Sequence, residues 1–189
     1  MSRGTIKRRR REKKTDYKQR LKLLKSGHPR LVVRKTSNNT IVQIIEWKRE
    51  GDNVLHHAEA QELKKMGWKG HTGNLPAAYL TGYLLGRRAQ KSSIENPVLD
   101  IGLQKNTPGN RIYSAVLGVL DSGLNVPAGE EMLPSKKRVQ GKHIEEYAAE
   151  MDEDRRQEHF SKMFDNGLDP QNISENFEEV KEKIESEVK

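Results

Sequence analysis

The charges of this chain are sorted along its length, and this sorting restricts where a folded core can form. Residues 1–35 contain 15 Lys and Arg against two acidic residues, whereas residues 145–189 contain 15 Asp and Glu against six Lys and Arg. Residues 36–144 are nearly balanced, with 14 cations against 10 carboxylates. Like charges repel within each terminal block, so we expect one modest core between two polarised extensions. The length of 189 residues and the mean hydropathy of -0.93 fit a single domain.

Composition divides the chain into a basic arm (1–27), a core (28–125), a basic loop (126–144) and an acidic helical extension (145–189). The arm lacks the apolar periodicity of an independent fold. Its Tyr17, Leu21 and Leu24 nevertheless have helical spacing and predict a short helix that docks on another surface. Two interpretations of the arm stay open at this point: a solvated, disordered tail or a polyanion-binding segment.

The core begins with three short runs rich in β-branched residues. "RLVVRKTS" (30–37), "TIVQIIEWK" (40–48) and "NVLHHA" (53–58) are separated by turn-forming residues and predict a three-strand antiparallel meander. "PVLDIGLQ" (97–104) alternates apolar and polar residues and predicts a further, half-buried strand. A strand reached through a helix usually pairs in parallel, so we expect a small mixed β-sheet.

Helical patterns connect and follow these strands. Residues 58–66 predict one or two helical turns that end at Gly67, and Asn74 is a suitable N-cap for a helix that runs to about Gln90. Asn110 caps a second helical pattern that ends at Gly123. The order β-β-β-α-α-β-α predicts an α/β fold with helices packed on the sheet.

The last third of the chain is charged and has only thin apolar stripes. Residues 123–143 predict a long connection, and loops of this length are usually functional or disordered. Beyond it, stripes such as Phe177, Val180 and Ile184 are too narrow for a core of their own. We expect them to pack on a partner or on the edge of the domain, or to remain partly frayed.

Residues that could support catalysis do not form a recognisable constellation. The chain has no cysteine, and His56 and His57 would point to opposite faces of a strand. The glycine-rich stretch 67–74 lacks the spacing of a phosphate-binding loop. Asp100 and Asp121 suggest a metal-dependent nuclease, but such sites need several converging carboxylates. We expect Asp100 to face solvent or a neighbouring cation, and no cofactor or metal.

The sequence also argues against a membrane protein. No apolar run approaches the roughly 20 residues of a membrane-spanning helix, and the N-terminus is too polar for a signal peptide. We expect a cytoplasmic protein without a small-molecule substrate.

The cationic segments favour RNA as the partner. Lys and Arg neutralise phosphates, Tyr17 can stack on an unpaired base, and Asn38 can contact ribose hydroxyls at a hairpin tip. No helix-turn-helix, zinc-finger or zipper pattern favours DNA. The residues alone leave open a structural RNA-binding protein or a non-ribosomal RNA-binding or metal-dependent RNA-processing factor.

Three segments in order, "PRLVVRKTSNNTIVQII" (29–45), "GWKGHTGNLPAAYLTGYLLGRRA" (67–89) and "RIYSAVLGVLDSGLNVP" (111–127), resemble the large-subunit ribosomal protein eighteen family. The likeness covers roughly residues 5–145, and the acidic tail is similar to the archaeal branch. The resemblance implies a structural protein, not an enzyme, that attaches 5S rRNA to the large-subunit rRNA in the central protuberance. It also implies neighbouring ribosomal proteins as partners of the chain.

The resemblance further implies which residues contact RNA. In the arm these are Arg8, Arg9, Arg10, Arg11, Lys13, Lys14, Tyr17 and Arg20. The strand and hairpin add Arg30, Arg34, Lys35 and Asn38, and the turn before the long helix adds His71 and Thr72. We add Lys136, Lys137 and Arg138 from the basic loop. Whether the acidic helices bind a protein neighbour or fold back on the core stays open.

Overall fold

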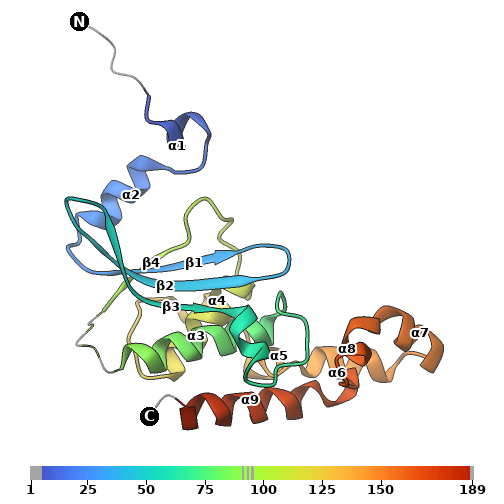
Figure 1. Cartoon of the computed structure of the whole chain (residues 1–189). Coiled ribbons are helices and arrows are strands. Elements are labelled where there is room, and N and C mark those ends of the chain that lie inside the picture. Colours follow the sequence, from blue (N-terminus) through green and yellow to red (C-terminus); the bar gives the residue numbers. More distant parts are fainter. Residues whose placement is uncertain (1–5, 91, 93, 95, 188–189) are drawn as a thin grey trace, which may run out of the picture.

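A computed structural model describes residues 6–90, 92, 94 and 96–187 (Figure 1). Its centre is a four-stranded mixed sheet in the order β3-β2-β1-β4. The strands β1 (Arg30–Lys35), β2 (Thr40–Trp47) and β3 (Asp52–Glu59) form the predicted antiparallel meander. The strand β4 (Val98–Asp100) pairs in parallel with β1, as the crossover rule predicts. The α/β fold class with its mixed sheet is confirmed.

The two faces of the sheet differ because side chains alternate along each strand. The cross-strand pairs Leu31 with Ile44 and Val33 with Val42 are fully buried on the inner face. The intervening residues of β1, which include Arg30 and Arg34, belong to the outer face. One face is therefore built for a hydrophobic core and the other for charge.

The inner face is covered by helices α3 (Leu75–Ala89) and α4 (Arg111–Asp121), which lie side by side beneath the sheet (Figure 1). Both predicted caps form: the Asn74 side chain accepts from Ala77 N at 2.9 Å, and the Asn110 side chain accepts from Ile112 N at 2.8 Å. Glycine permits their close approach, since a Cβ at Gly118 would lie 2.1 Å from the Tyr79 carbonyl oxygen. The turn predicted at 58–66 is the 3₁₀-helix η1 (Ala60–Lys64).

The predicted strand 97–104 is much shorter than expected, because β4 ends at Asp100. Gly102 then turns the chain with φ +63°, and its N–H donates to the Asp100 carboxylate at 2.9 Å. Leu99 and Ile101 are partly buried against the core, as predicted, but Asp100 is 5% exposed and Leu103 is 56% exposed, the reverse of the expected burial. Apolar alternation was misleading here because an ion-pair network occupies the outer face.

The C-terminal part of the chain packs against the body instead of fraying. Its long helix α9 (Ile173–Glu187) buries Ile173, Phe177, Val180 and Ile184 in the same hydrophobic cluster as α3, so it forms a third layer below α3 and α4 (Figure 1). Of the predicted alternatives, the domain edge is therefore correct for this helix. Between α4 and α9 lie η2 (Glu130–Met132), α5 (Lys136–Val139), α6 (Lys142–Ala149), α7 (Glu153–His159), α8 (Ser161–Asp165) and η3 (Pro170–Asn172).

The predicted basic loop is partly helical, because α5 and the start of α6 fall within it. Val139 of α5 is 2% exposed and belongs to the core cluster, which fixes this connection on the body. In the chain as far as it is described, no helix is both long and apolar enough to cross a membrane.

The basic arm contains α1 (Arg8–Arg11) and the predicted docking helix α2 (Tyr17–Leu24), and both lie above the sheet (Figure 1). The Asp16 carboxylate caps α2 by accepting from Lys18 N at 2.8 Å and Gln19 N at 3.1 Å. Of the predicted stripe, Tyr17 and Leu24 are half-buried but Leu21 is 55% exposed, and Arg20 of the same helix contacts the sheet.

Candidate RNA interface

The arm and the outer face of the sheet are joined by alternating arginines and carboxylates. Arg20 of α2 donates from Nη2 to both oxygens of Asp52, at 2.9 and 2.8 Å. The same Asp52 accepts from Arg30 at 2.9 Å, and the other arm of the Arg30 guanidinium donates to Asp100 at 2.7 Å. Arg34 completes the series by donating to Asp100 at 2.8 Å.

Burial makes the inner part of this network strong. The Arg30 and Asp100 side chains are 3% and 7% exposed, whereas Arg34 is 38% exposed. Burial alone would raise the pKa of Asp100, but the hydrogen bonds and charges of Arg34 and Arg30 outweigh it and hold the pKa below its usual value. Asp100 is therefore ionised at neutral pH and holds both arginines in place. Of these two arginines, Arg34 has a surface that is available to a ligand.

A cavity of about 100 Å³ lies between the arm and the sheet at this network. Arg9 and Lys14 of the arm line it together with Arg20, Arg30 and Arg34. The carboxylates Asp16 and Asp100 line it as well, so the five cations leave an excess of positive charge that favours a phosphate group. Arg30 already donates to two carboxylates. It is therefore better placed to orient the other cations of this surface than to contact RNA itself.

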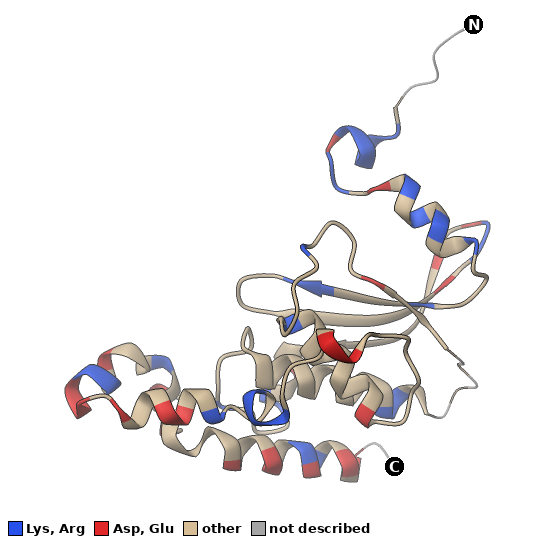
Figure 2. Ribbon diagram, turned by 180° about the vertical axis from the view of Figure 1, so that it is seen from behind, with Lys and Arg blue, Asp and Glu red and all other residues tan. Residues whose placement is uncertain are grey.

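The outermost part of the arm projects from the body and is exposed. All four arginines of α1 and the neighbouring Lys13 and Lys14 are exposed. Tyr17 is half-buried, and Lys7 Nζ lies 5.0 Å from its ring centroid. Figure 2 shows the resulting concentration of Lys and Arg on α1 and α2.

The tip of the β1–β2 hairpin forms a second polar cluster. The Asn38 carbonyl oxygen accepts from the Thr72 hydroxyl, which brings together two predicted site residues from different segments. Arg111 of α4 fixes this arrangement by donating to the carbonyl oxygens of Thr36 and Gly73, both at 2.8 Å. The Asn38 side chain remains exposed at the tip.

His71 lies in the same turn, where its Nδ1 accepts from Gly73 N at 3.0 Å. Partial burial lowers the pKa of His71, and the nearby charges of Lys162, Arg111 and Lys64 lower it further. The imidazole is therefore neutral at neutral pH and offers hydrogen bonds rather than charge. Together with the exposed Asn38 side chain it forms a polar surface suited to ribose and base edges, whereas Thr72 is 7% exposed and holds this turn against the hairpin tip.

Comparison with known proteins identifies the family. The model of the family described as "Ribosomal large subunit proteins 60S L5, and 50S L18" matches residues 3–97, which include the arm, the meander and α3. The chain belongs to this family. It is 49% identical over 181 residues to the "Large ribosomal subunit protein uL18" of Methanothermobacter thermautotrophicus, covering 96% of this chain and 94% of that protein. The protein of the same name from Methanococcus maripaludis is 48% identical over 179 residues, covering 94% and 93%.

These relatives extend the likeness beyond the family model to the C-terminal helices, in line with the predicted archaeal type. The family is one of ribosomal proteins and not of enzymes. The two carboxylates considered for a nuclease have separate roles in this family member, since Asp100 binds arginines and Asp121 accepts from the Tyr79 hydroxyl at 2.7 Å. In the described ranges, no three His, Asp or Glu side chains are grouped so that they could hold a metal ion.

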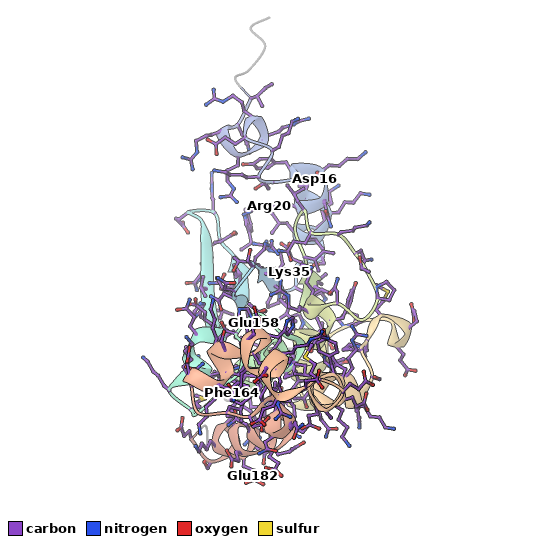
Figure 3. The ribbon with its side chains drawn as sticks, turned by 90° about the vertical axis from the view of Figure 1, so that its right-hand side faces the viewer. Asp16, Arg20, Lys35, Glu158, Phe164 and Glu182 are labelled. Carbon is purple, nitrogen blue, oxygen red and sulfur yellow. The ribbon has the colours of Figure 1, made fainter. Side chains whose placement is uncertain are left out.

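The structure separates the predicted RNA-contacting residues of this family member into two regions. The arm lies above the sheet, and β1 runs from the arm to the hairpin tip at the other end of the sheet (Figure 1). Figure 3 labels Arg20 of the arm and Lys35 at the end of β1. The α5 cations Lys136, Lys137 and Arg138 are exposed but lie below the sheet, beside α9 (Figures 1 and 2). The Gln140 side chain, which follows α5, donates to Glu178 of α9 at 3.0 Å.

Of the two surroundings expected for Asp100, a neighbouring cation is correct, because Arg30 and Arg34 both bind it. Asp52 and Arg111, which also hold this surface in place, are not among the residues predicted for the site. Their partners lie between 22 and 75 residues away along the chain. In the sequence, Asp52 and Asp100 stand out only because negative charges are rare near a cationic segment.

Proposed function

We propose that this chain is a structural protein of the large ribosomal subunit. It binds 5S rRNA through the basic arm, the outer face of β1 and the hairpin tip, and it attaches 5S rRNA to the large-subunit rRNA in the central protuberance. The observation that carries the proposal is the docking of the basic arm on the outer face of the sheet, where Arg20, Arg30 and Arg34 gather, in a member of a ribosomal protein family.

The two polar regions of this interface have complementary chemistry. The arm supplies exposed arginines whose affinity for phosphates comes from counterion release and does not depend on sequence. The hairpin tip supplies the exposed Asn38 and His71, which suit ribose hydroxyls and base edges in unpaired RNA, while the nearly buried Thr72 positions them. Specific docking therefore requires the tip, while the arm raises the affinity.

The separate α5 cations fit a second RNA contact. A protein that joins two RNA molecules needs two binding surfaces that do not compete for one ligand. Lys136, Lys137 and Arg138 lie away from the arm (Figure 1), so we assign them to the large-subunit rRNA instead of 5S rRNA.

Salt-dependent binding tests this assignment. The affinity of the full chain for 5S rRNA and for a scrambled RNA of equal length is measured between about 50 and 200 mM salt. Two variants are compared: Arg8, Arg9, Arg10 and Arg11 all changed to Gln, and Lys136, Lys137 and Arg138 all changed to Gln. The second is the control, because it also removes exposed positive charge.

We expect a preference for 5S rRNA that persists at the higher salt concentration. Each phosphate contact contributes about 0.7 to 0.9 to the slope of log affinity against log salt, so the α1 variant should lower the slope by up to about 3 to 4. The α5 variant should bind 5S rRNA like the unchanged chain and associate less tightly with large-subunit rRNA. Equal affinity of the full chain for both RNAs at every salt concentration would contradict the proposal.

A further inference from the structure

One guanidinium group joins the β1–β2 hairpin tip to the turn before α3. Arg111, the first residue of α4, donates from Nη2 to the Thr36 carbonyl oxygen and from Nη1 to the Gly73 carbonyl oxygen, both at 2.8 Å. Its Nη1 also donates to the Ser37 carbonyl oxygen at 3.4 Å. Three segments that are far apart in the sequence therefore meet at this side chain.

The Thr72 hydroxyl makes a second contact between the hairpin tip and the turn by donating to the Asn38 carbonyl oxygen. Three consecutive carbonyl oxygens of the tip, those of residues 36–38, thus accept hydrogen bonds from outside the hairpin. We call these contacts of Arg111 and Thr72 the Arg111 clamp. The backbone of the tip is therefore fixed by the body of the protein as well as by its own turn.

The two segments held by the Arg111 clamp are tightly packed. A Cβ added at Gly73 would lie 2.5 Å from the Ser37 carbonyl oxygen and 2.7 Å from Cε1 of His71. Glycine is therefore needed for the close approach of the turn to the hairpin. Figure 1 shows the hairpin end of β1 and β2 on the same side of the molecule as the start of α3.

The clamp presents two exposed polar side chains, Asn38 from the hairpin and His71 from the turn. Nδ1 of His71 accepts from Gly73 N at 3.0 Å, so the neutral ring has its proton on Nε2 and can donate from there. The Asn38 amide can both donate and accept. The relative position of these two groups is set by contacts that the clamp makes.

The positive charge of Arg111 is not neutralised within the clamp. Burial lowers the pKa of Arg111, but a guanidinium group remains charged at neutral pH. Within the described part of the chain, no carboxylate forms an ion pair with it. The charge therefore adds to the positive potential around the hairpin tip, while both Nη atoms are bonded to the backbone of the protein itself.

We propose that Arg111 is a positioning residue for RNA recognition: it holds the hairpin tip and the turn 71–74 together as one preformed surface, and the preference for 5S rRNA depends on this surface. The inference rests on the proposed function, which assigns Asn38 and His71 to RNA. A preformed surface binds more tightly than a loop that becomes ordered on binding, because ordering reduces the affinity. Lys has one compact ammonium group and cannot reproduce the planar fork that spans the two segments.

Binding of the full chain and its variants to 5S rRNA and to a scrambled RNA of equal length tests the proposal. Arg111→Lys keeps the charge and removes the fork, and Thr72→Val removes the other contact of the clamp. The matched control is Arg88→Lys, since Arg88 also joins separate segments, by donating to the His57 carbonyl oxygen at 2.6 Å and to Glu62 at 2.7 Å. Thermal unfolding of each variant is followed by circular dichroism, so that affinities are compared on folded chains.

We expect Arg111→Lys to reduce the preference for 5S rRNA by about tenfold or more, because the tip and the turn then become ordered only on binding. The slope of log affinity against log salt should stay within about 0.5 of the original, since no phosphate contact is lost. Thr72→Val should reduce the preference in the same way. The double variant should lose less than the product of the two single effects, because both residues act on one clamp.

Arg88→Lys should retain the full preference, even where it lowers the midpoint of thermal unfolding as much as Arg111→Lys does. A full preference in Arg111→Lys would overturn the proposal, because charge alone would then suffice. An equal loss of preference in Arg88→Lys would also overturn it, because reduced stability would then be the cause. If Arg111→Lys is unfolded at the assay temperature, Thr72→Val decides by the same comparison. Absence of any 5S rRNA preference in the unchanged chain would instead refute the proposed function.

Discussion

Replacing Asp100 by Asn should destabilise the fold far more than an ordinary surface substitution. The carboxylate accepts from Arg30 at 2.7 Å, from Arg34 at 2.8 Å and from Gly102 N at 2.9 Å, in a side chain that is 7% exposed. Asn keeps one acceptor oxygen but directs an N–H donor at one of the two guanidinium groups. The nearly buried Arg30 then keeps Asp52 as its remaining counter-charge.

The expected loss can be worked from these contacts. Hydrogen bonds to charged groups contribute about 1.5 to 3 kcal/mol each, and breaking a buried ion pair costs about 3 to 5 kcal/mol. Because Asp52 still offsets part of the Arg30 charge, we expect Asp100→Asn to lower the free energy of unfolding by about 3 to 4 kcal/mol. For a domain of this size the midpoint of thermal unfolding should fall by roughly 6 to 16 °C.

Urea unfolding at pH 7 measures this loss, with Asp121→Asn as the control. Asp121 accepts one hydrogen bond, from the Tyr79 hydroxyl at 2.7 Å, which an amide oxygen can also accept, so we expect a loss below about 1 kcal/mol. A loss below about 1 kcal/mol for Asp100→Asn as well would refute the reasoning, since the network would then be equivalent to a solvated surface pair.

The pH dependence gives an independent check on Asp100. Its pKa in the folded protein is below the ordinary value of 3.8, so the unfolded chain binds the proton more readily. The stabilisation from Asp100 is therefore fully present above about pH 4 and is lost as the pH falls through the lower folded-state pKa. Stability measured from pH 6 to pH 2 should decline more steeply for the unchanged chain than for Asp100→Asn.

Three further predictions concern the arm, the helix pair and the C-terminal layer. Asp52→Ala removes the partner of Arg20, so hydrogen exchange measured by mass spectrometry should accelerate across Tyr17–Leu24, while the neighbouring control Glu50→Gln should leave it unchanged. Gly118→Ala places a Cβ 2.1 Å from a backbone oxygen of α3 and should cost about 2 to 3 kcal/mol in urea unfolding. Burial and the hydrogen bond to Glu185 raise the pKa of Tyr83 to about 12, so its stabilisation is present below about pH 10 and is lost between pH 10 and 12. Spectrophotometric titration should show one fewer late-ionising tyrosine in Tyr83→Phe.

The sequence predicted the elements of the core well because their signals are local. Asn74 and Asn110 cap helices through backbone groups two or three residues away, and the β-branched runs alternate with a period of two. Such patterns need no knowledge of the rest of the fold. The meander, both central helices and the parallel fourth strand could therefore be predicted.

The predictions that depended on distant partners were less successful. The fourth strand was expected to extend to 104 with Asp100 on its polar side, but a network joining residues 20, 30, 34, 52 and 100 buries that carboxylate. Helix α9 had a stripe too narrow for its own core and found its partner in α3, about 100 residues earlier in the chain. Local periodicity contains no information about such pairings.

The separation of the two charged ends has a physical consequence for RNA binding. The arm lies above the sheet, while α9 lies below α3 and α4, so the sheet and a layer of helices stand between them (Figure 1). Sheet and helix layers are each about 10 Å thick, whereas charges in solution are screened beyond about 8 Å at physiological ionic strength. The acidic helices therefore leave the attraction between the arm and RNA almost unchanged. Charges of both signs can then serve different partners on one small protein, which a mixed surface with the same net charge could not achieve.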